Sequence, residues 1–192
     1  SAWVAGSTHP GEEDIVIKVF KTLHISFPDL RLVLAPRHIE RAETVASLLR
    51  QHGLSFQRLS KLLEGEALQT SIVIVDTIGH LKYLYSIASL VFIGKSLCAH
   101  GGQNMIEPAV LGKPVVVGPN TQNFKGIMEI LLQAKAILQV KTKIELRNTV
   151  DKLLRDPAFA RKIGQSAKDA IQMHQGATER TQEKLAPLLK TL

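Results

Sequence analysis

Short, continuously apolar segments alternate along this chain with segments of helical periodicity, and this alternation limits the folds that the chain can adopt. An apolar run of three to five residues suits a strand that is buried on both faces. The helical segments 15–23, 39–49 and 124–132 each place their apolar residues on one face. Strands that alternate with helices predict an α/β fold, a Rossmann-like parallel sheet with helices on both faces. The strands are expected at 3–5, 32–35, 72–75, 90–93, 115–117 and 136–140, with one more at 56–59.

After Thr142 the strand pattern stops and only helical periodicity remains. A chain of 192 residues with 45% hydrophobic residues has the size of one domain. We therefore expect a single domain over 1–192, with an α/β core over about 1–142 and a helical tail over 143–192. The tail is expected to contain helices at 143–155, 157–173 and 177–190, separated at Asp156–Pro157 and Gln175–Gly176.

The charge of the chain favours an anionic partner. The 24 Lys and Arg residues outnumber the 17 Asp and Glu residues, and the net charge of +7 suits nucleotides, phospholipid headgroups or nucleic acid. Only 5% of the residues are aromatic, and no basic stripe is interleaved with them, so nucleic acid is not an expected partner. The 7 histidines lack metal-ligand spacing, no Asp-x-Asp pair occurs, and Cys98 is the single cysteine. Neither a metal nor another cofactor is therefore expected.

The hydropathy pattern bears on the location of the chain. No run of about 18 apolar residues occurs, so no transmembrane helix is expected. The first residues lack the basic and then apolar order of a signal peptide. A single cysteine suits a reducing compartment. These features together predict a soluble chain in the cytoplasm.

Most of the polar, glycine and proline residues that the strand and helix patterns leave unexplained follow the predicted strands. They fall in the loops 6–11, 36–38, 76–80, 94–104 and 118–123. The carboxyl ends of parallel strands meet at one edge of a sheet, and ligands bind there at the point where the strand order reverses. These loops are therefore expected to form the binding site.

The loop 98–108 carries the clearest signal for a ligand. Gly101 and Gly102 let the backbone approach a ligand closely, and a helix that begins near Asn104 would present N–H groups to a phosphate. Glu107, in the first turn of that helix, is placed to accept hydrogen bonds from ribose hydroxyls. The alternative is a capped helix in which Glu107 only complements the helix dipole. The loop pattern alone leaves both interpretations open.

Residues in the other strand-end loops also admit two interpretations. The segment 6–11 lacks the G-x-G-x-x-G fingerprint of dinucleotide-binding enzymes. Ser7 and Thr8 could contact a phosphate or carboxylate, but we favour a role in capping the next helix, whose first turn is acidic. Arg37 could hold a phosphate in a forked geometry or be a surface arginine. Cys98 is expected to be a buried or half-buried thiol rather than a nucleophile.

Several of these loops, in their order along the chain, resemble one enzyme family. They resemble the carboxyl-terminal half of the 3-deoxy-D-manno-octulosonic acid (Kdo) transferases, which are bacterial glycosyltransferases of the GT-B fold in lipopolysaccharide assembly. The resemblance extends from about residue 3 to the last predicted helix. Several motifs in the right order are more specific than any one of them. The matching segments are 5–13, 34–38, 75–79, 94–97, 100–104, 107–108, 118–119 and 123–124.

The resemblance implies a function and a division of labour. Members of the family move Kdo from CMP-Kdo to the lipid A precursor at the cytoplasmic face of the bacterial inner membrane, which the full protein contacts peripherally. The catalytic base belongs to an amino-terminal acceptor domain, which is expected to be absent from this chain. We therefore expect no catalytic residue here, no transfer by this chain alone, and binding of the donor without a metal.

The resemblance also implies which residues surround the donor. One group would contact the cytidine and its phosphate, a second would surround the phosphate, and a third would hold the ribose. The residues that would contact the cytidine and its phosphate are Pro36, Arg37, Ile78 and Gly79. Those that would surround the phosphate are Ser96, Gly101, Gly102 and Asn104, and Glu107 would hold the ribose. Further candidates are Ser7, Thr8, His9 and Asn123.

Some positions depart from the pattern of the family. His80 stands where a Glu is common, Lys95 where a second glycine is common, and Cys98 and Ala99 where a Val-Pro type pair is more usual. Two other interpretations of the whole chain remain open. The chain could belong to a related enzyme that uses a UDP-sugar, such as a transferase or a 2-epimerase. It could also be a nucleotide-binding module without catalytic activity.

Overall fold

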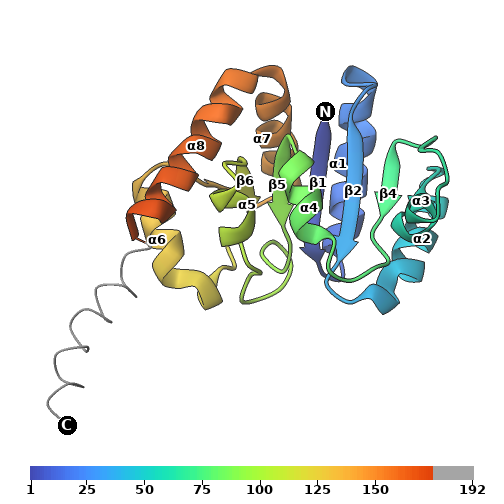
Figure 1. Ribbon diagram of the computed structural model, residues 1–192, viewed down its shortest axis with the longest axis horizontal. Coiled ribbons are helices and arrows are strands. Elements are labelled where there is room, and N and C mark those ends of the chain that lie inside the picture. The colour runs from blue at the N-terminus through green and yellow to red at the C-terminus, as the bar shows by residue number, and fades with distance from the viewer. Residues whose placement is uncertain (175–192) are drawn as a thin grey trace, which may run out of the picture.

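A parallel sheet organises the protein (Figure 1). The computed structural model describes residues 1–174. The sheet has seven strands in the order β3-β4-β2-β1-β5-β6-β7, and each neighbouring pair is parallel. The predicted Rossmann-like α/β class is therefore confirmed. The strands are β1 (Ala2–Thr8), β2 (Arg31–Pro36), β3 (Gln57–Arg58), β4 (Ile72–Ile74), β5 (Leu90–Ile93), β6 (Val115–Val117) and β7 (Leu138–Gln139).

Helices cover both faces of the sheet (Figure 1). One face carries α1 (Glu12–Ser26), α2 (Ala42–Gln51) and α7 (Lys143–Arg155). The other face carries α4 (Leu81–Ile87), α5 (Ile106–Val110), α6 (Lys125–Gln133) and most of α8 (Pro157–His174). Three short elements complete the described chain: η1 (Ile39–Arg41), α3 (Leu59–Leu63) and η2 (Gln122–Phe124).

Alternate residues of the central strands enter two different hydrophobic cores. Trp3 and Ala5 of β1 lie in the same core as Phe20 of α1, whereas Val4 between them lies in the same core as Ala109 of α5. These central strands are therefore apolar on both faces, which is why the sequence is apolar where they form. The helices after residue 142 contribute to both cores, so they pack against the sheet layers.

The order of the sheet reverses between β1 and β5. The strands β2, β3 and β4 lie on one side of β1, and β5, β6 and β7 lie on the other. Gly94 permits close packing of the two central strand ends, because a Cβ at this position would lie 2.3 Å from the carbonyl oxygen of Ser7. The carboxyl ends of β1 and β5 thus form the switch point at which open α/β sheets bind ligands.

The predicted strands are present, and the differences concern short helices. β3 ends at Arg58 because Leu59 begins α3. Periodicity does not predict α4, since Tyr83 and Ile87 are 61% and 66% exposed and place apolar residues on its outer face as well. The helix expected from residue 39 begins with the single turn η1 before α2.

The predicted helices at 143–155 and 157–173 correspond to α7 and α8. The helix predicted at 177–190 lies outside the described residues. Among residues 1–174, no helix combines the length and the apolar composition needed to cross a membrane.

Gly164, in the middle of α8, allows this helix to pack against the chain that follows α5. A Cβ at Gly164 would lie 2.0 Å from the carbonyl oxygen of Gly112, whereas a Cβ at Gly126 of α6 would meet no atom within 4 Å. We expect Gly164→Ala to lower the free energy of unfolding by about 1–3 kcal/mol, because the overlap outweighs the helix propensity of alanine. Gly126→Ala should raise it by up to about 1 kcal/mol, because only the propensity changes.

Urea unfolding of the two variants and the wild type measures both effects. A Gly164→Ala variant at least as stable as the wild type would contradict the close packing of α8.

Candidate functional site

A cleft of about 280 Å³ lies at the carboxyl ends of β1, β2 and β4. It brings together residues from three predicted loops: Ser7 near the end of β1, Arg37 after β2 and Ile78 after β4. The topology of the parallel sheet causes this convergence, since the three strands end at the same edge. The residues that line the cleft are Ser7, Ala35, Pro36, Arg37, His38, Ile39, Glu40, Val75, Thr77, Ile78, Gly79 and Leu81.

Arg37 offers a positive charge to this cleft. Its backbone N–H donates to the carbonyl oxygen of Thr8 at 3.0 Å, which fixes the start of the loop against β1. Its side chain is exposed, and no carboxylate of residues 1–174 forms an ion pair with it. Ile78 is 79% exposed and adds an apolar surface at the rim. The cleft therefore combines a cation with an apolar edge.

The loop after β5 is fixed by the carboxylate of Glu12, the first residue of α1. Glu12 is fully buried. Its Oε2 accepts hydrogen bonds from the N–H groups of His9 at 3.0 Å and Lys95 at 2.7 Å. Its Oε1 accepts from those of Ser96 at 2.9 Å and Leu97 at 2.8 Å. Four backbone donors thus converge on one carboxylate at the switch point of the sheet.

Ser96 supports the loop and does not offer its hydroxyl to a ligand, contrary to its predicted place around a phosphate. The residue is fully buried. Its hydroxyl donates to the carbonyl oxygen of Ile93 and accepts from the N–H of Gly118 at 2.8 Å. Both hydrogen-bonding functions of the hydroxyl are therefore used within the protein.

Gly101 and Gly102 both adopt backbone conformations that favour glycine, with φ of +110° and +72°. A Cβ at Gly101 would lie 2.6 Å from the Nδ2 of Asn123, and one at Gly102 would lie 3.1 Å from the carbonyl oxygen of Asn120. The N–H of Asn123 also donates to the carbonyl oxygen of Gly101 at 3.0 Å. The structure thus places the predicted residues Gly101, Gly102 and Asn123 side by side.

Asn104 and Glu107 form the start of α5. The Oδ1 of Asn104 accepts from the N–H of Ile106 at 3.0 Å, and its Nδ2 donates to the Oε1 of Glu107 at 2.9 Å. The helix begins at Ile106, two residues later than expected. Asn104 therefore caps the helix, while the exposed Glu107 keeps its Oε2 available to a ligand.

The predicted capping of α1 by Ser7 or Thr8 is wrong. Both residues belong to β1, and the residue that precedes α1 is Gly11, with no side-chain hydrogen bond to the helix. Thr8 is fully buried, so its side chain is also not accessible to a ligand. Ser7 lines the cleft and has a φ of +54°.

His9 lies at the same edge of the sheet. The centre of its ring is 6.2 Å from that of His38, which lines the cleft. Its Nδ1 is 3.2 Å from the carbonyl oxygen of Ser7.

Two of the three acidic residues in the first turn of α1, Glu12 and Glu13, are buried. Glu13 is fully buried, with its Oε1 3.3 Å from an Nη of Arg41. Burial raises the pKa of Glu13, and Arg41 opposes this rise. Glu12 and Glu13 thus act in tertiary contacts in addition to any effect on the helix dipole.

Cys98 is exposed, so the prediction of a buried or half-buried thiol is wrong. Partial burial of the sulfur, and then the charges of Glu12 and Glu13, raise the pKa of this thiol. A raised pKa keeps the group protonated, which agrees with the prediction that Cys98 is not a nucleophile.

The sequence does not predict the role of Tyr85, which α4 places against the end of β1. Tyr85 is 1% exposed, and a Cβ at Gly6 would lie 2.1 Å from its hydroxyl oxygen. Burial, and then the charge of Glu107, raise the pKa of Tyr85, so the phenol stays neutral. The signal in the sequence is Gly6 itself, since a glycine in an apolar strand often marks a close approach.

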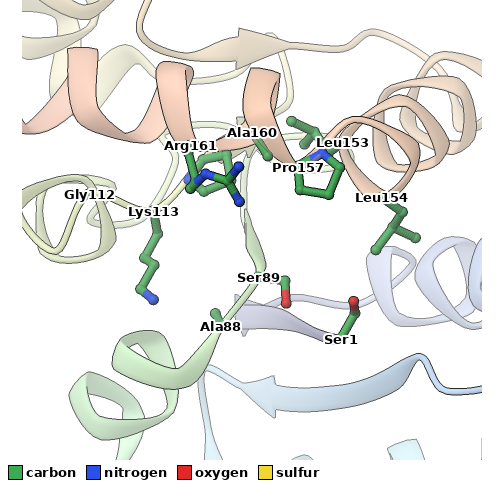
Figure 2. Close-up of a pocket in the computed structure, with 11 residues that line it drawn as sticks. Ser1, Ala88, Ser89, Gly112, Lys113, Leu153, Leu154, Pro157, Ala160 and Arg161 are labelled. Carbon is green, nitrogen blue, oxygen red and sulfur yellow. The ribbon is translucent and has the colours of Figure 1, made fainter.

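A second cleft of about 240 Å³ lies at the opposite edge of the sheet, before β5 and β6 (Figure 2). Its wall includes Ser89, Lys113, Leu153 and Arg161. None of the predicted site residues lines it. Ligands of open α/β sheets bind at the carboxyl ends of the strands, so the cleft that contains Arg37 is the better candidate. In the described part of the chain, no group of three or more His, Cys, Asp or Glu side chains is placed to hold a metal ion.

Comparison with known proteins identifies the family of the chain. The family described as "Glycosyl transferases group 1" matches residues 13–170. The 3-deoxy-D-manno-octulosonic acid transferase of Haemophilus influenzae is 34% identical over 98% of this chain and 44% of that relative. The probable mitochondrial 3-deoxy-D-manno-octulosonic acid transferase of Arabidopsis thaliana is 34% identical over 88% of this chain and 39% of that relative. The chain thus spans less than half the length of these relatives.

A solved structure extends the comparison to three dimensions. It is the crystal structure of the C-terminal CMP-Kdo binding domain of WaaA from Acinetobacter baumannii, with a TM-score of 0.83 and 27% identity. The match covers 90% of this chain and 89% of that domain. The resemblance that the loop motifs indicate is confirmed: the chain belongs to the group 1 glycosyl transferases and is related over nearly its whole length to the 3-deoxy-D-manno-octulosonic acid transferases.

Proposed function

We propose that this chain binds the nucleotide donor in a glycosyltransferase that moves Kdo from CMP-Kdo to the lipid A precursor. The observation that carries the proposal is the cleft beside the switch point, in which Arg37, Ile78 and Gly79 converge in a chain similar to a CMP-Kdo binding domain. A guanidinium suits the phosphate of CMP, and an exposed apolar side chain suits the face of a pyrimidine.

This part of the enzyme must hold CMP and stabilise the negative charge that develops on CMP as it leaves. In a direct displacement, the bond between the anomeric carbon of Kdo and the phosphate oxygen breaks as the acceptor oxygen attacks. Negative charge then grows on the phosphate, where Arg37 would stabilise it. Glu107 would accept hydrogen bonds from the ribose hydroxyls through the oxygen that Asn104 leaves free. The base that deprotonates the acceptor would come from the part of the enzyme outside this chain.

The proposal extends to the setting of the reaction. The acceptor would be bound by the amino-terminal part of the full protein, which would contact the cytoplasmic face of the bacterial inner membrane peripherally. Binding of the donor would require no metal or other cofactor, since the cation of Arg37 faces the position proposed for the phosphate. This chain by itself would transfer no Kdo.

Titration calorimetry with CMP and UDP tests the proposed donor. We expect CMP to bind at least about tenfold more tightly than UDP, because the site would discriminate the two bases by hydrogen bonds to the cytosine edge. Tighter binding of UDP would indicate a UDP-sugar enzyme instead. Incubation with CMP-Kdo and the lipid A precursor, with and without the amino-terminal part, separates a donor-binding part from a complete catalyst.

Arg37→Ala should weaken CMP binding, because it removes a charge-assisted hydrogen bond to the phosphate, and the loss is about 1.5–3 kcal/mol if the bound nucleotide shields this bond from water. Lys113→Ala is the matched control, since it removes a cation from the cleft at the opposite edge. The two affinities are measured by calorimetry on folded proteins. Equal CMP affinity in Arg37→Ala and the wild type would remove Arg37 from the site.

Glu107→Gln should reduce the affinity for CMP more than the affinity for 2′,3′-dideoxy-CMP. Glutamine keeps the size of the side chain but loses the charge that strengthens hydrogen bonds from the ribose hydroxyls. Glu129→Gln, an exposed position on α6, controls for the change in net charge. If both ligands weaken equally, or neither does, Glu107 is a helix-start residue and not a ribose contact.

A further inference from the structure

The N–H groups of Lys95, Ser96 and Leu97 form a concave site for an anion. Consecutive backbone N–H groups that converge on one point bind phosphates and carboxylates. Here they converge on the carboxylate of Glu12, which the chain itself supplies. A donor phosphate therefore has no access to these N–H groups, although they lie at the switch point where a ligand is expected.

We propose that Glu12 is a positioning residue for the donor site. Its carboxylate occupies the place of a phosphate in the loop after β5 and so holds this loop in the shape that binds the nucleotide. Lys95 adopts a φ of +56°, a conformation that favours glycine, and its hydrogen bond to Glu12 helps to hold it there. The inference rests on the proposed function, since it assigns a role in binding the same donor.

The loop that Glu12 holds is bonded in turn to the segments proposed to surround the donor. The carbonyl oxygen of Lys95 accepts from the N–H of Gly102 at 2.9 Å, and that of Ser96 accepts from the N–H of Asn120 at 2.9 Å. The hydroxyl of Ser96 accepts from the N–H of Gly118. A shift of Lys95 or Ser96 is therefore transmitted directly to the glycine loop and to the loop after β6.

Glu13 provides a control for the role of Glu12, because the fold could simply require a buried acidic residue at the start of α1. It is the next residue, it is also fully buried, and it shares the positive end of the helix dipole. Its ion pair is with Arg41, and within residues 1–174 it makes no hydrogen bond to the loop after β5. Glu13→Gln is therefore a matched control for Glu12→Gln.

The test compares Glu12→Gln, Glu12→Asp and Glu13→Gln with the wild-type chain. In Glu12→Gln one acceptor oxygen becomes an NH₂ group that faces two N–H donors, whereas aspartate keeps both acceptors on a shorter side chain. The dissociation constant for CMP is measured by calorimetry at a temperature where circular dichroism shows each variant folded. Hydrogen–deuterium exchange over residues 95–102, without ligand, reports on the loop itself.

We expect Glu12→Gln to weaken CMP binding by at least about tenfold, from the loss of charge-assisted hydrogen bonds, and to speed exchange in the loop. Glu12→Asp should show both effects to a smaller extent. Glu13→Gln should lower the melting temperature but leave the dissociation constant within about twofold and the exchange of the loop unchanged, because its ion pair with Arg41 lies away from the loop after β5.

The outcomes separate the inference from the proposed function. A folded Glu12→Gln variant with wild-type affinity for CMP overturns the inference and leaves the function intact. A wild-type chain that does not bind CMP overturns the function and the inference with it. If Glu12→Gln does not fold, Glu12→Asp decides: faster exchange with weaker CMP binding supports the role, and faster exchange with unchanged binding overturns it.

Discussion

The hydrogen bonds of Glu12 connect the two strand ends between which the sheet reverses its order. Removing an ionised carboxylate from water costs several kcal/mol, and such a group is stable in a protein only when its acceptor sites are satisfied. Glu12 meets this condition with four backbone N–H groups, one from its own loop and three from the loop after β5. The same bonds satisfy the buried N–H group of Ser96 and three partly buried N–H groups. The start of α1 and the end of β5 are therefore fixed together.

Close backbone contacts complete this arrangement. Gly94 brings the end of β5 against β1. Gly118 likewise lets the loop after β6 pack against the loop after β5, because a Cβ at this position would lie 2.0 Å from the carbonyl oxygen of Ser96. No side chain could be added at either position without moving the backbone. Glu12 and Ser96 thus hold the backbone of the loops after β5 and β6, whereas Arg37 and Ile78 in the neighbouring cleft remain exposed. A fixed backbone beside exposed side chains suits a ligand that binds from solvent.

The sequence is sufficient to predict the central strands of the sheet, because strands buried on both faces leave unbroken apolar runs. It also predicts that Arg37, Ile78 and Gly79 meet, because the carboxyl ends of parallel strands share an edge. The role of Glu12 could not be predicted, since its partners in the loop after β5 lie 83 to 85 residues away. An acidic residue in a first helical turn is equally compatible with a simple effect on the helix dipole.

The errors in the site have the same origin. Ser7 and Thr8 have the residue types of a helix cap, but β1 extends through both of them and Gly11 precedes the helix. Ser96 has the residue type of a phosphate ligand, but its hydroxyl is used by Ile93 and Gly118. In each case a contact made by the tertiary structure replaces the local role that the residue type suggests.

The openness of the cleft bears on the chemistry that it can support. Ile78 is 79% exposed at the rim, so water reaches the position proposed for the phosphate. An exposed guanidinium stabilises a growing negative charge only weakly, because water screens the interaction. The same pair interacts more strongly when water is excluded. In the proposed function, a second surface that binds the acceptor and covers the cleft would supply this exclusion. Closure would then couple the arrival of the acceptor to the stabilisation of the leaving nucleotide, so that the donor is protected from hydrolysis until an acceptor is present.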